Sequence, residues 1–366
     1  MAISCEFGVK REGEAVMDNM MKAAVLHAPG CLQIEDVPVP VPGKNEVLVK
    51  VLACGVCGSD IPRIVKTGTY HFPTIPGHEF GGMVCRTGSE EYQYLVGKKV
   101  AVNPLIPCYE CEMCEVGKFA QCKQYDFLGS RSHGGFAQYA KVPVKNLIVM
   151  PDQLDDKATA FLEPVTVALH VVQNCQLRFG ENVAVFGLGA IGMFIAQWAK
   201  AFGAAHVFAI DIDEKKVALA KAVGLDEAIC SGQEDIEKTI GEKTGGVEFV
   251  FEASGSEIAF SQAIHILRQS GTLGLVGRPT RNLSVAPQVF EKILRSQLTI
   301  KGTWSFESVN FPHNAWKQST AAIDKGQIQI SQLISHCFSL ERTMEAIELM
   351  AKQKEFYSKI LIIPND

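Results

Sequence analysis

The sequence has no excess of positive charge. Its 366 residues include 35 Lys and Arg against 40 Asp and Glu, which gives a formal net charge of −5 at pH 7. A protein that binds nucleic acid needs a basic face to neutralise phosphates and release their counterions. We therefore expect no nucleic acid partner. Internal repeats and low-complexity tracts are also absent, and a content of 47% hydrophobic and 20% charged residues is that of an ordinary globular protein.

A hydrophobic run long enough to cross a membrane is missing as well. The most membrane-like stretch, Val183–Ala199, carries no charge, but it is shorter than the roughly 20 residues of a typical span, and three glycines interrupt it. The first twenty residues contain several charges and no apolar core like that of a secretory signal. We therefore expect neither a membrane partner nor export, and we interpret residues 1–20 as a flexible N-terminal tail.

Cysteine, in contrast, is abundant, with twelve residues. Without an export signal, this number indicates reduced thiols and metal ligands and argues against a disulfide framework. Seven of the twelve are scattered, and most of these are expected to be small buried hydrophobic residues. They are Cys5, Cys31, Cys54, Cys85, Cys175, Cys230 and Cys337. The other five have informative neighbours or spacing.

Four cysteines lie close together in a lobe at about residues 104–124. Cys108, Cys111, Cys114 and Cys122 are spaced three, three and eight residues apart. Four thiolates in this arrangement can close a tetrahedron around Zn²⁺. Because sulfur would fill every ligand position, no position would remain for water or substrate, and the metal would serve to fold the lobe. An iron–sulfur cluster on the same sulfurs and cysteines without metal are the alternatives.

A second, dispersed set of residues has the chemistry of a catalytic zinc site. Such a site needs about three protein ligands and an open position where water or an alcohol binds. Cys57 and His78, with one or both of Glu79 and Glu163, can supply those ligands. Taken singly, these residues are more simply explained as a buried cysteine, a core histidine and surface acids. The set gains weight only from the motif that follows it along the chain.

That motif is Gly187-Leu188-Gly189-Ala190-Ile191-Gly192, which directly follows an apolar strand and opens a helix. In this context it is typical of a dinucleotide site. Gly187 allows the tight turn, Gly189 lets the backbone approach a pyrophosphate, and Gly192 permits close packing of the helix on the strand. The N-terminus of the helix then faces the anion. The motif predicts cofactor contacts from all of its residues except Leu188.

Asp211 lies at the end of the next predicted strand, 24 residues after Gly187. A carboxylate at this position accepts hydrogen bonds from the adenosine ribose. Its charge would repel a 2′-phosphate, and the next residues, Ile212 and Asp213, offer no arginine to neutralise one. We therefore expect NAD as the cofactor in preference to NADP.

Strands and amphipathic helices alternate from Glu181 onward, which is the pattern of a parallel sheet with helices on both faces. Six strands are predicted, enough for a complete dinucleotide-binding fold. They are Val183–Phe186, Val207–Ile210, Glu227–Ile229, Glu248–Phe251, Thr272–Val276 and Leu298–Ile300. The part before them has short strand-forming segments punctuated by Gly and Pro, and we interpret it as an irregular, mostly β domain. These segments include Lys22–His27, Val47–Leu52, Lys99–Val102 and Ala137–Val144.

The last part of the chain, after Thr303, contains no further glycine motif. It has helix candidates near Asn314–Lys325 and Glu341–Lys352 and a strand candidate at Lys359–Ile363. We expect this part to return to the first domain.

Taken together, these motifs resemble the zinc-dependent medium-chain dehydrogenases, from about Met21 to the end of the chain. The resemblance rests on Cys57-Gly58-Ser59-Asp60, Gly77-His78-Glu79, Glu163-Pro164, the four-cysteine lobe and the glycine motif. It implies an α/β protein with two domains. A GroES-like, mostly β catalytic domain would comprise residues 21–168 and 304–366, and a Rossmann domain with a doubly wound, parallel, six-stranded sheet would comprise residues 169–303.

The position of Glu163 indicates a branch of this family. The alcohol dehydrogenase branch usually has a cysteine ligand there, so the chain looks like a polyol dehydrogenase, which oxidises secondary alcohols to ketones. The resemblance implies two zinc ions per chain, NAD, a homodimer or homotetramer, and a cytoplasmic location. The substrate would be a sugar alcohol or its phosphate, converted to a ketose or ketose phosphate. An unphosphorylated polyol such as sorbitol or xylitol, or L-threonine, is the alternative, and a zinc-binding interaction module without catalysis is the alternative of another class.

Within this site we expect Ser59 to accept the proton of the substrate hydroxyl. Glu79 is expected to act as a zinc ligand, an exchangeable ligand or a group that orients the site. Pro62 stands where related sorbitol and threonine dehydrogenases usually carry a histidine, so one usual terminus of the proton relay is missing. A phosphorylated substrate would also need a cation, and arginine's fork suits phosphate. The candidates are Arg63, our first choice, then Arg131, Lys66 and Arg278.

Overall fold

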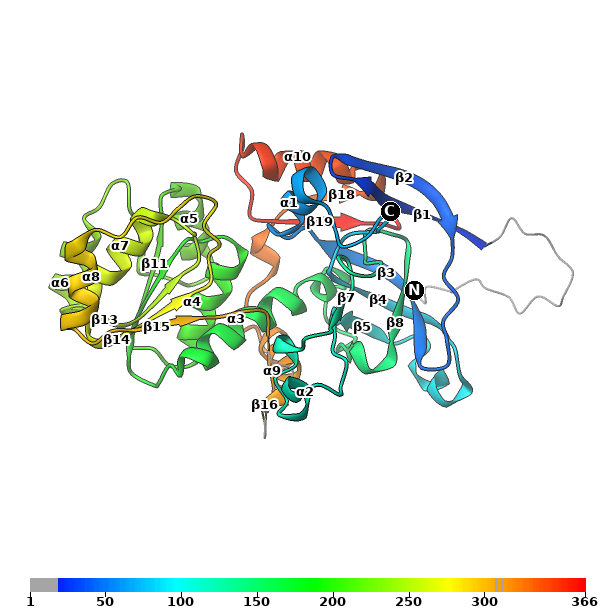
Figure 1. Ribbon diagram of the computed structural model, residues 1–366, viewed down its shortest axis with the longest axis horizontal. Helices are drawn as coiled ribbons and strands as arrows, with labels where there is room; N and C mark the ends of the chain where they lie inside the picture. The colour runs from blue at the N-terminus through cyan, green and yellow to red at the C-terminus, as the bar shows by residue number, and fades with distance from the viewer. Residues whose placement is uncertain (1–18, 307–308, 311–312) are drawn as a thin grey trace, which may run out of the picture. The chain divides into compact units, whose positions relative to one another are not determined.

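The computed structural model divides the chain into two units, each with its own sheet (Figure 1). It describes residues 19–306, 309–310 and 313–366, so most of the predicted N-terminal tail lies outside the described residues. The first unit comprises the described residues up to Cys111, then Cys122–Glu163 and His336–Asp366; the second comprises Glu112–Gln121 and Pro164–Ser335.

The first unit is built on a seven-stranded sheet. Six of its strands lie in the order β18-β19-β3-β4-β5-β9, and β8 pairs with β3 as well. Their bounds are β3 Glu46–Gly55, β4 Glu79–Thr87, β5 Lys99–Val102, β8 Tyr139–Pro143, β9 Leu147–Val149, β18 Ile334–Ser339 and β19 Lys359–Ile363. Two smaller antiparallel pairs accompany the sheet, namely β1 Met20–Ala28 with β2 Cys31–Pro38, and β6 Leu105–Ile106 with β7 Asp126–Phe127.

Strand β3 occupies the middle of this sheet because both of its faces are apolar. Its sequence, Glu-Val-Leu-Val-Lys-Val-Leu-Ala-Cys-Gly, is rich in β-branched residues and almost fully buried. Valines of β3 pack in one core cluster with residues of β1, β4, β5, β8, β19 and helix α10 (Thr343–Lys352). The expected mostly β domain is thus confirmed, and its short helical segments lie at the ends of strands. They are α1 Asp60–Pro62, η2 Arg63–Thr67, η3 Glu90–Leu95, η5 Val144–Asn146, η6 Asp156–Ala160 and η8 Leu340–Arg342.

The second unit contains a six-stranded parallel sheet in the order β12-β11-β10-β13-β14-β15. The strands are β10 Asn182–Phe186, β11 His206–Asp211, β12 Ala228–Cys230, β13 Val247–Glu252, β14 Leu267–Leu275 and β15 Thr299–Gly302. The chain starts in the middle, runs to one edge, and returns to build the other half, which is the doubly wound arrangement. All six predicted strands are present, and only their ends differ, most of all in β14, which begins five residues earlier than expected.

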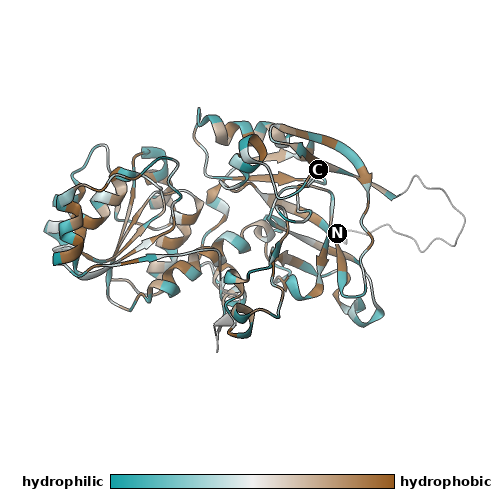
Figure 2. Cartoon of the chain, viewed as in Figure 1, coloured by the Kyte–Doolittle hydropathy of each residue, from teal (hydrophilic) through white to brown (hydrophobic). Residues whose placement is uncertain are grey.

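Helices cover both faces of this sheet. In Figure 1, α6 (Ile236–Thr244), α7 (Glu257–Ile266) and α8 (Pro287–Arg295) lie side by side, and their apolar residues share one core cluster with the strands. Helices α4 (Ala190–Ala201) and α5 (Glu214–Ala222) follow β10 and β11 and contact those strands. Hydropathy colouring shows hydrophobic residues along the strands of this sheet (Figure 2), as expected for strands buried on both faces.

The remaining elements connect these parts of the chain. They are α2 Glu112–Glu115, η4 Phe119–Gln121, α3 Leu162–Cys175, β16 Val309–Asn310, β17 His313–Asn314, α9 Ala315–Asp324 and η7 Ser331–Leu333. Within the described residues, no helix is both long enough and apolar enough to cross a membrane.

The division between the units differs from the predicted boundaries in three places. Residues 112–121 and 164–168 group with the second unit, although the predicted catalytic domain includes them. Residues 304–335 were assigned to the first domain, but the structure groups their described part with the second unit. The Gln173 side chain of α3 donates to Gln318 of α9 at 3.0 Å, and Gln329 exchanges hydrogen bonds with Gln197 of α4 at 2.7 and 3.2 Å. The part of the chain from β18 onward joins the first sheet, where β19 pairs with β3.

Candidate active site and metal centres

Pairing of β3 with β4 brings three of the predicted catalytic residues together. The two strands run antiparallel with Gly55 opposite Glu79. Cys57 follows the end of β3 and His78 immediately precedes β4, so both lie at the same end of the pair. One ligand atom from each of Cys57, His78 and Glu79 lies within 4.8 Å of the others. This set of thiolate, imidazole and carboxylate donors suits zinc.

Asp60, to which the sequence analysis gave no role, contacts both Cys57 and His78. Its side chain is fully buried, accepts a hydrogen bond from the Cys57 backbone N–H at 3.0 Å, and lies 3.2 Å from His78 Nδ1. Burial alone would lower the pKa of His78, but the charges of Asp60 and Cys57 raise it well above its usual value. A carboxylate on one ring nitrogen fixes the orientation of a ligating histidine and leaves the other nitrogen for the metal.

Glu79 forms a buried ion pair with Lys359 from the first residue of β19. Both residues are 2% exposed. The pair is possible because residue 55 is glycine: a Cβ there would lie 2.3 Å from Glu79 Oε2 and 2.7 Å from Lys359 Cε. The sequence analysis missed Lys359, because a single lysine at the start of a late strand carries no signal of its partner.

Glu163 is the second residue of α3 and lies outside the group of three. It is 7% exposed. Burial raises its pKa to about 7, with Glu79 and Asp60 adding to the effect and His78 and Lys359 opposing it. Glu163 therefore lies in the same electrostatic environment as the group of three, although the structure does not bring its carboxylate within the same short distances.

Ser59 is hydrogen-bonded to Cys57, a proposed metal ligand. Its hydroxyl donates to Cys57 Sγ at 3.3 Å, and Arg63 Nη1 donates to Ser59 Oγ at 3.2 Å. Arg63 Nη1 also lies 3.5 Å from Asp60 Oδ1. The Arg63 guanidinium is thus committed to the loop that carries Cys57.

The four cysteines of the lobe form a second metal-ligating group. One sulfur from each of Cys108, Cys111, Cys114 and Cys122 lies within 4.8 Å of the others, with Sγ–Sγ distances of 3.4 Å from Cys122 to Cys108 and 3.9 Å to Cys111. A zinc tetrahedron with bonds of about 2.3 Å has sulfurs about 3.8 Å apart. The sulfurs therefore fit a zinc ion that has no further ligand position.

The glycine motif has the geometry expected of a dinucleotide loop. Gly187 has a φ of +89°, and a Cβ on it would lie 2.7 Å from the Ser254 nitrogen. A Cβ on Gly192 would lie 1.8 Å from the Gly187 oxygen, so the helix and the turn pack too closely for any side chain. Gly189, the N-cap of α4, has open space around its Cα and makes no side-chain cap hydrogen bond. Ala190 and Ile191 form the first turn of this helix.

Asp211 ends β11 beside this loop. Its carboxylate accepts hydrogen bonds from the Leu188 N–H at 2.6 Å and the Asp213 N–H at 2.9 Å, and Lys216 Nζ lies 3.9 Å away. The hydrogen bond to Leu188 ties the end of the second strand to the glycine loop.

Two further cations were proposed for a phosphate, Lys66 and Arg278, and within the described residues neither side chain forms a hydrogen bond or ion pair with the Cys57 loop. Lys66 is exposed in η2, and Arg278 lies 4.9 Å from the centre of the Trp304 ring in the second unit.

Comparisons with known proteins agree with both units. The family model described as an alcohol dehydrogenase GroES-like domain matches residues 43–152, and the model described as a zinc-binding dehydrogenase matches residues 190–325. Galactitol 1-phosphate 5-dehydrogenase of Escherichia coli K12 is 34% identical over 94% of this chain and 100% of its own length. Sorbitol dehydrogenase of Bacillus subtilis is 31% identical over 94% of this chain and 98% of its own length. A crystal structure of the Escherichia coli galactitol-1-phosphate dehydrogenase superposes with a TM-score of 0.87, with 94% and 100% coverage.

The fold, the zinc-ligand chemistry and these matches define a class of enzyme. The chain belongs to the zinc-dependent medium-chain dehydrogenases. It is an alcohol dehydrogenase of the NAD-dependent, zinc type, and the resemblance stated from its motifs is confirmed.

Proposed function

We propose that this enzyme oxidises a secondary alcohol of a sugar alcohol or its phosphate to the ketone, in the manner of galactitol-1-phosphate 5-dehydrogenase. One observation carries the proposal: Cys57, His78 and the Glu79 carboxylate come together, in a chain that is 34% identical to that dehydrogenase over 94% of its length. The reaction converts the alcohol and NAD⁺ to a ketone, NADH and a proton.

Cys57 and His78 would hold the catalytic zinc, with Glu163 completing the ligand set and Glu79 as a ligand or an orienting group. Zinc bound there supplies Lewis acidity, which lowers the pKa of the substrate hydroxyl enough for hydride loss near neutral pH. Asp60 orients His78, and Lys359 holds the Glu79 carboxylate. Ser59 Oγ would accept the hydroxyl proton and pass it on towards solvent, since it lies beside Cys57 Sγ.

A second zinc would be bound by the four cysteines of the lobe, which gives two zinc ions per chain. Gly187, Gly189, Ala190, Ile191 and Gly192 would bind the pyrophosphate of NAD, and Asp211 the adenosine ribose. We also propose a homodimer or homotetramer in the cytoplasm, as the family resemblance implies.

A substrate panel tests the proposed function. NADH formation by zinc-replete enzyme should be measured with galactitol 1-phosphate, galactitol, sorbitol, xylitol and L-threonine. We expect the highest kcat/KM with galactitol 1-phosphate. Preference for sorbitol or xylitol would favour the second candidate, a free-polyol dehydrogenase, which the 31% identity to sorbitol dehydrogenase supports. Binding of zinc without any oxidation or NADH binding would contradict both and favour a zinc-binding interaction module.

A further inference from the structure

The guanidinium of Arg131 is flanked by aromatic side chains. It lies between two aromatic rings, 3.9 Å from the centre of Tyr70 and 4.3 Å from the centre of Tyr125. It is partly buried, and Nε is buried without a hydrogen-bond partner. Among the described residues, no carboxylate forms an ion pair with it. With no carboxylate in the described part of the chain to neutralise it, this cation can take up an anion without losing an ion pair.

Arg63 differs from Arg131 because its guanidinium already has a counter-ion. Its guanidinium already has Asp60 as counter-ion at 3.5 Å and donates to Ser59. A phosphate at Arg63 would compete with these contacts, whereas a phosphate at Arg131 would displace none of the ion pairs in the described structure. The contacts therefore reverse the order of preference that proximity in the sequence suggested.

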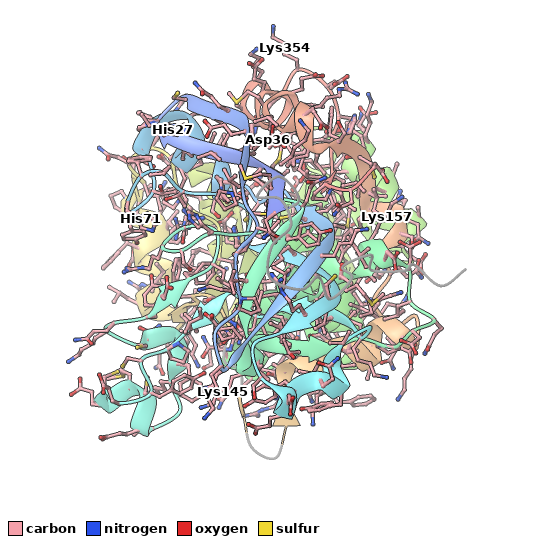
Figure 3. The ribbon with its side chains drawn as sticks, turned by 90° about the vertical axis from the view of Figure 1, so that its right-hand side faces the viewer. His27, Asp36, His71, Lys145, Lys157 and Lys354 are labelled. Carbon is pink, nitrogen blue, oxygen red and sulfur yellow. The ribbon has the colours of Figure 1, made fainter. Side chains whose placement is uncertain are left out.

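The backbone holds Arg131 in a fixed turn. The Phe127 carbonyl accepts hydrogen bonds from the N–H groups of Ser130, Arg131 and Ser132 at 2.8–3.2 Å. The Arg131 carbonyl accepts from Nε2 of His71, which is labelled in Figure 3. Cation–π contacts with Tyr70 and Tyr125 also help to hold the guanidinium in place.

The same turn packs against the metal-ligand loop. Gly129, two residues before Arg131, has a φ of +86°, and a Cβ on it would lie 2.6 Å from the carbonyl of Gly77 and 2.9 Å from the backbone nitrogen of His78. The Phe127 ring lies 5.7 Å from the His78 ring and 6.4 Å from the Tyr125 ring. The turn that carries Arg131 therefore packs against the metal-ligand loop within one unit.

We propose that Arg131, held between Tyr70 and Tyr125, binds the phosphate monoester of the substrate and sets the preference for a phosphorylated polyol. This inference rests on the proposed function and names the substrate class of the same site. Arg63, in contrast, is a positioning residue that holds Ser59 and Asp60 through direct contacts.

Two substrates and four variants test this assignment. For Arg131→Ala, we expect kcat/KM with galactitol 1-phosphate to fall about 10- to 100-fold, mainly through KM, since a charge-assisted bidentate contact is lost. The loss of kcat/KM with galactitol, which carries no phosphate, should be at least about 10-fold smaller. Arg131→Lys should lie between wild type and Arg131→Ala, because lysine keeps the charge but loses the fork. Arg63→Ala should instead lower kcat with both substrates by a similar factor.

Arg342→Ala is the matched control, because Arg342 also lies over an aromatic ring, Phe338 at 5.0 Å, but is paired with Glu345. It should change neither substrate's kinetics. Equal losses with both substrates in Arg131→Ala, or a wild-type enzyme without preference for the phosphorylated substrate, would overturn the assignment. If the wild-type enzyme oxidises neither polyol, the proposed function fails, and calorimetric titration with inorganic phosphate decides the Arg131 site: binding to wild type but not to Arg131→Ala supports it, and equal binding or none overturns it.

Discussion

At the residue scale, the proposed catalytic site depends on buried charges that complement one another. Asp60 forms an ion pair with His78, and Lys359 forms one with Glu79, although Lys359 lies 280 residues away from Glu79 in the chain. Such pairs contribute little net stability when intact, but removing one partner leaves an uncompensated buried charge. They hold the ligand atoms in place for metal binding.

Replacing Cys57 by serine should remove the catalytic metal and leave the metal of the lobe. We expect kcat/KM to fall more than about 100-fold, since Lewis acidity supplies several kcal/mol of transition-state stabilisation. Zinc content should fall from two ions to one per chain. Cys31→Ser, which changes a thiol away from both cysteine sites, serves as the control. Unchanged activity in Cys57→Ser, with metal content measured on the same sample, would refute the ligand assignment.

Two lysines with contrasting partners test the role of the buried ion pair. Lys359→Met should lower the free energy of unfolding by about 3–5 kcal/mol, because Glu79 would remain charged and buried. Lys99→Met is the matched control: Lys99 is also buried, but its partner Asp156, at 2.8 Å, has a 46% exposed side chain. Its loss should cost only about 1 kcal/mol. Denaturant unfolding of both variants measures the difference, and equal losses would contradict the account.

His170 of α3 predicts a loss of stability in acid. Burial, helped by the charge of Lys301, lowers its pKa to about 4, below the ordinary value of 6.5. Between pH 4 and 6.5 only the unfolded chain binds the proton. The free energy of unfolding is therefore unaffected by protonation of His170 above pH 6.5 and falls as the pH drops towards 4. The loss should be on the order of 1–3 kcal/mol. Urea unfolding of wild type and His170→Asn at pH 7.5 and 5 isolates it, and an equal pH dependence in both proteins would disprove the shift.

At the element scale, the four-cysteine lobe is expected to serve folding and not chemistry. In Cys111→Ser, zinc content should fall by one ion per chain, and the thermal midpoint should drop by more than about 5 °C. The protein that remains folded should keep most of its kcat. A stable Cys111→Ser protein that has lost activity as completely as Cys57→Ser would show that the lobe takes part in the reaction.

The elements themselves were largely predictable from local pattern. The six parallel strands and the glycine loop follow from apolar runs and Gly residues that are neighbours in sequence. The strand at Lys359–Ile363 was found at its observed bounds. What the pattern did not reveal were contacts between distant segments, because Lys359 beside Glu79 or Tyr70 beside Arg131 results from strand pairing and loop packing. Asp60 lay within a recognised motif, yet its ion pair with His78 became visible only in the fold.

At the scale of the whole molecule, two units divide the chemistry between them. The first unit carries Cys57, His78, Glu79, Glu163 and Ser59, and the second carries the glycine loop and Asp211. The proposed reaction needs both, one for the alcohol and one for the cofactor. The proposed oligomer belongs to this scale as well. Light scattering coupled to gel filtration should give the mass of two or four chains, and a monomer would contradict that proposal.

The most direct test of the central claim is the zinc dependence of NADH formation from galactitol 1-phosphate. Enzyme treated with chelator until only the lobe zinc remains should be inactive, and adding one equivalent of Zn²⁺ should restore NADH formation. The same addition should fail to restore Cys57→Ser. Full activity in the chelated enzyme, or rescue of Cys57→Ser by zinc, would contradict a zinc-dependent dehydrogenase centred on Cys57 and His78.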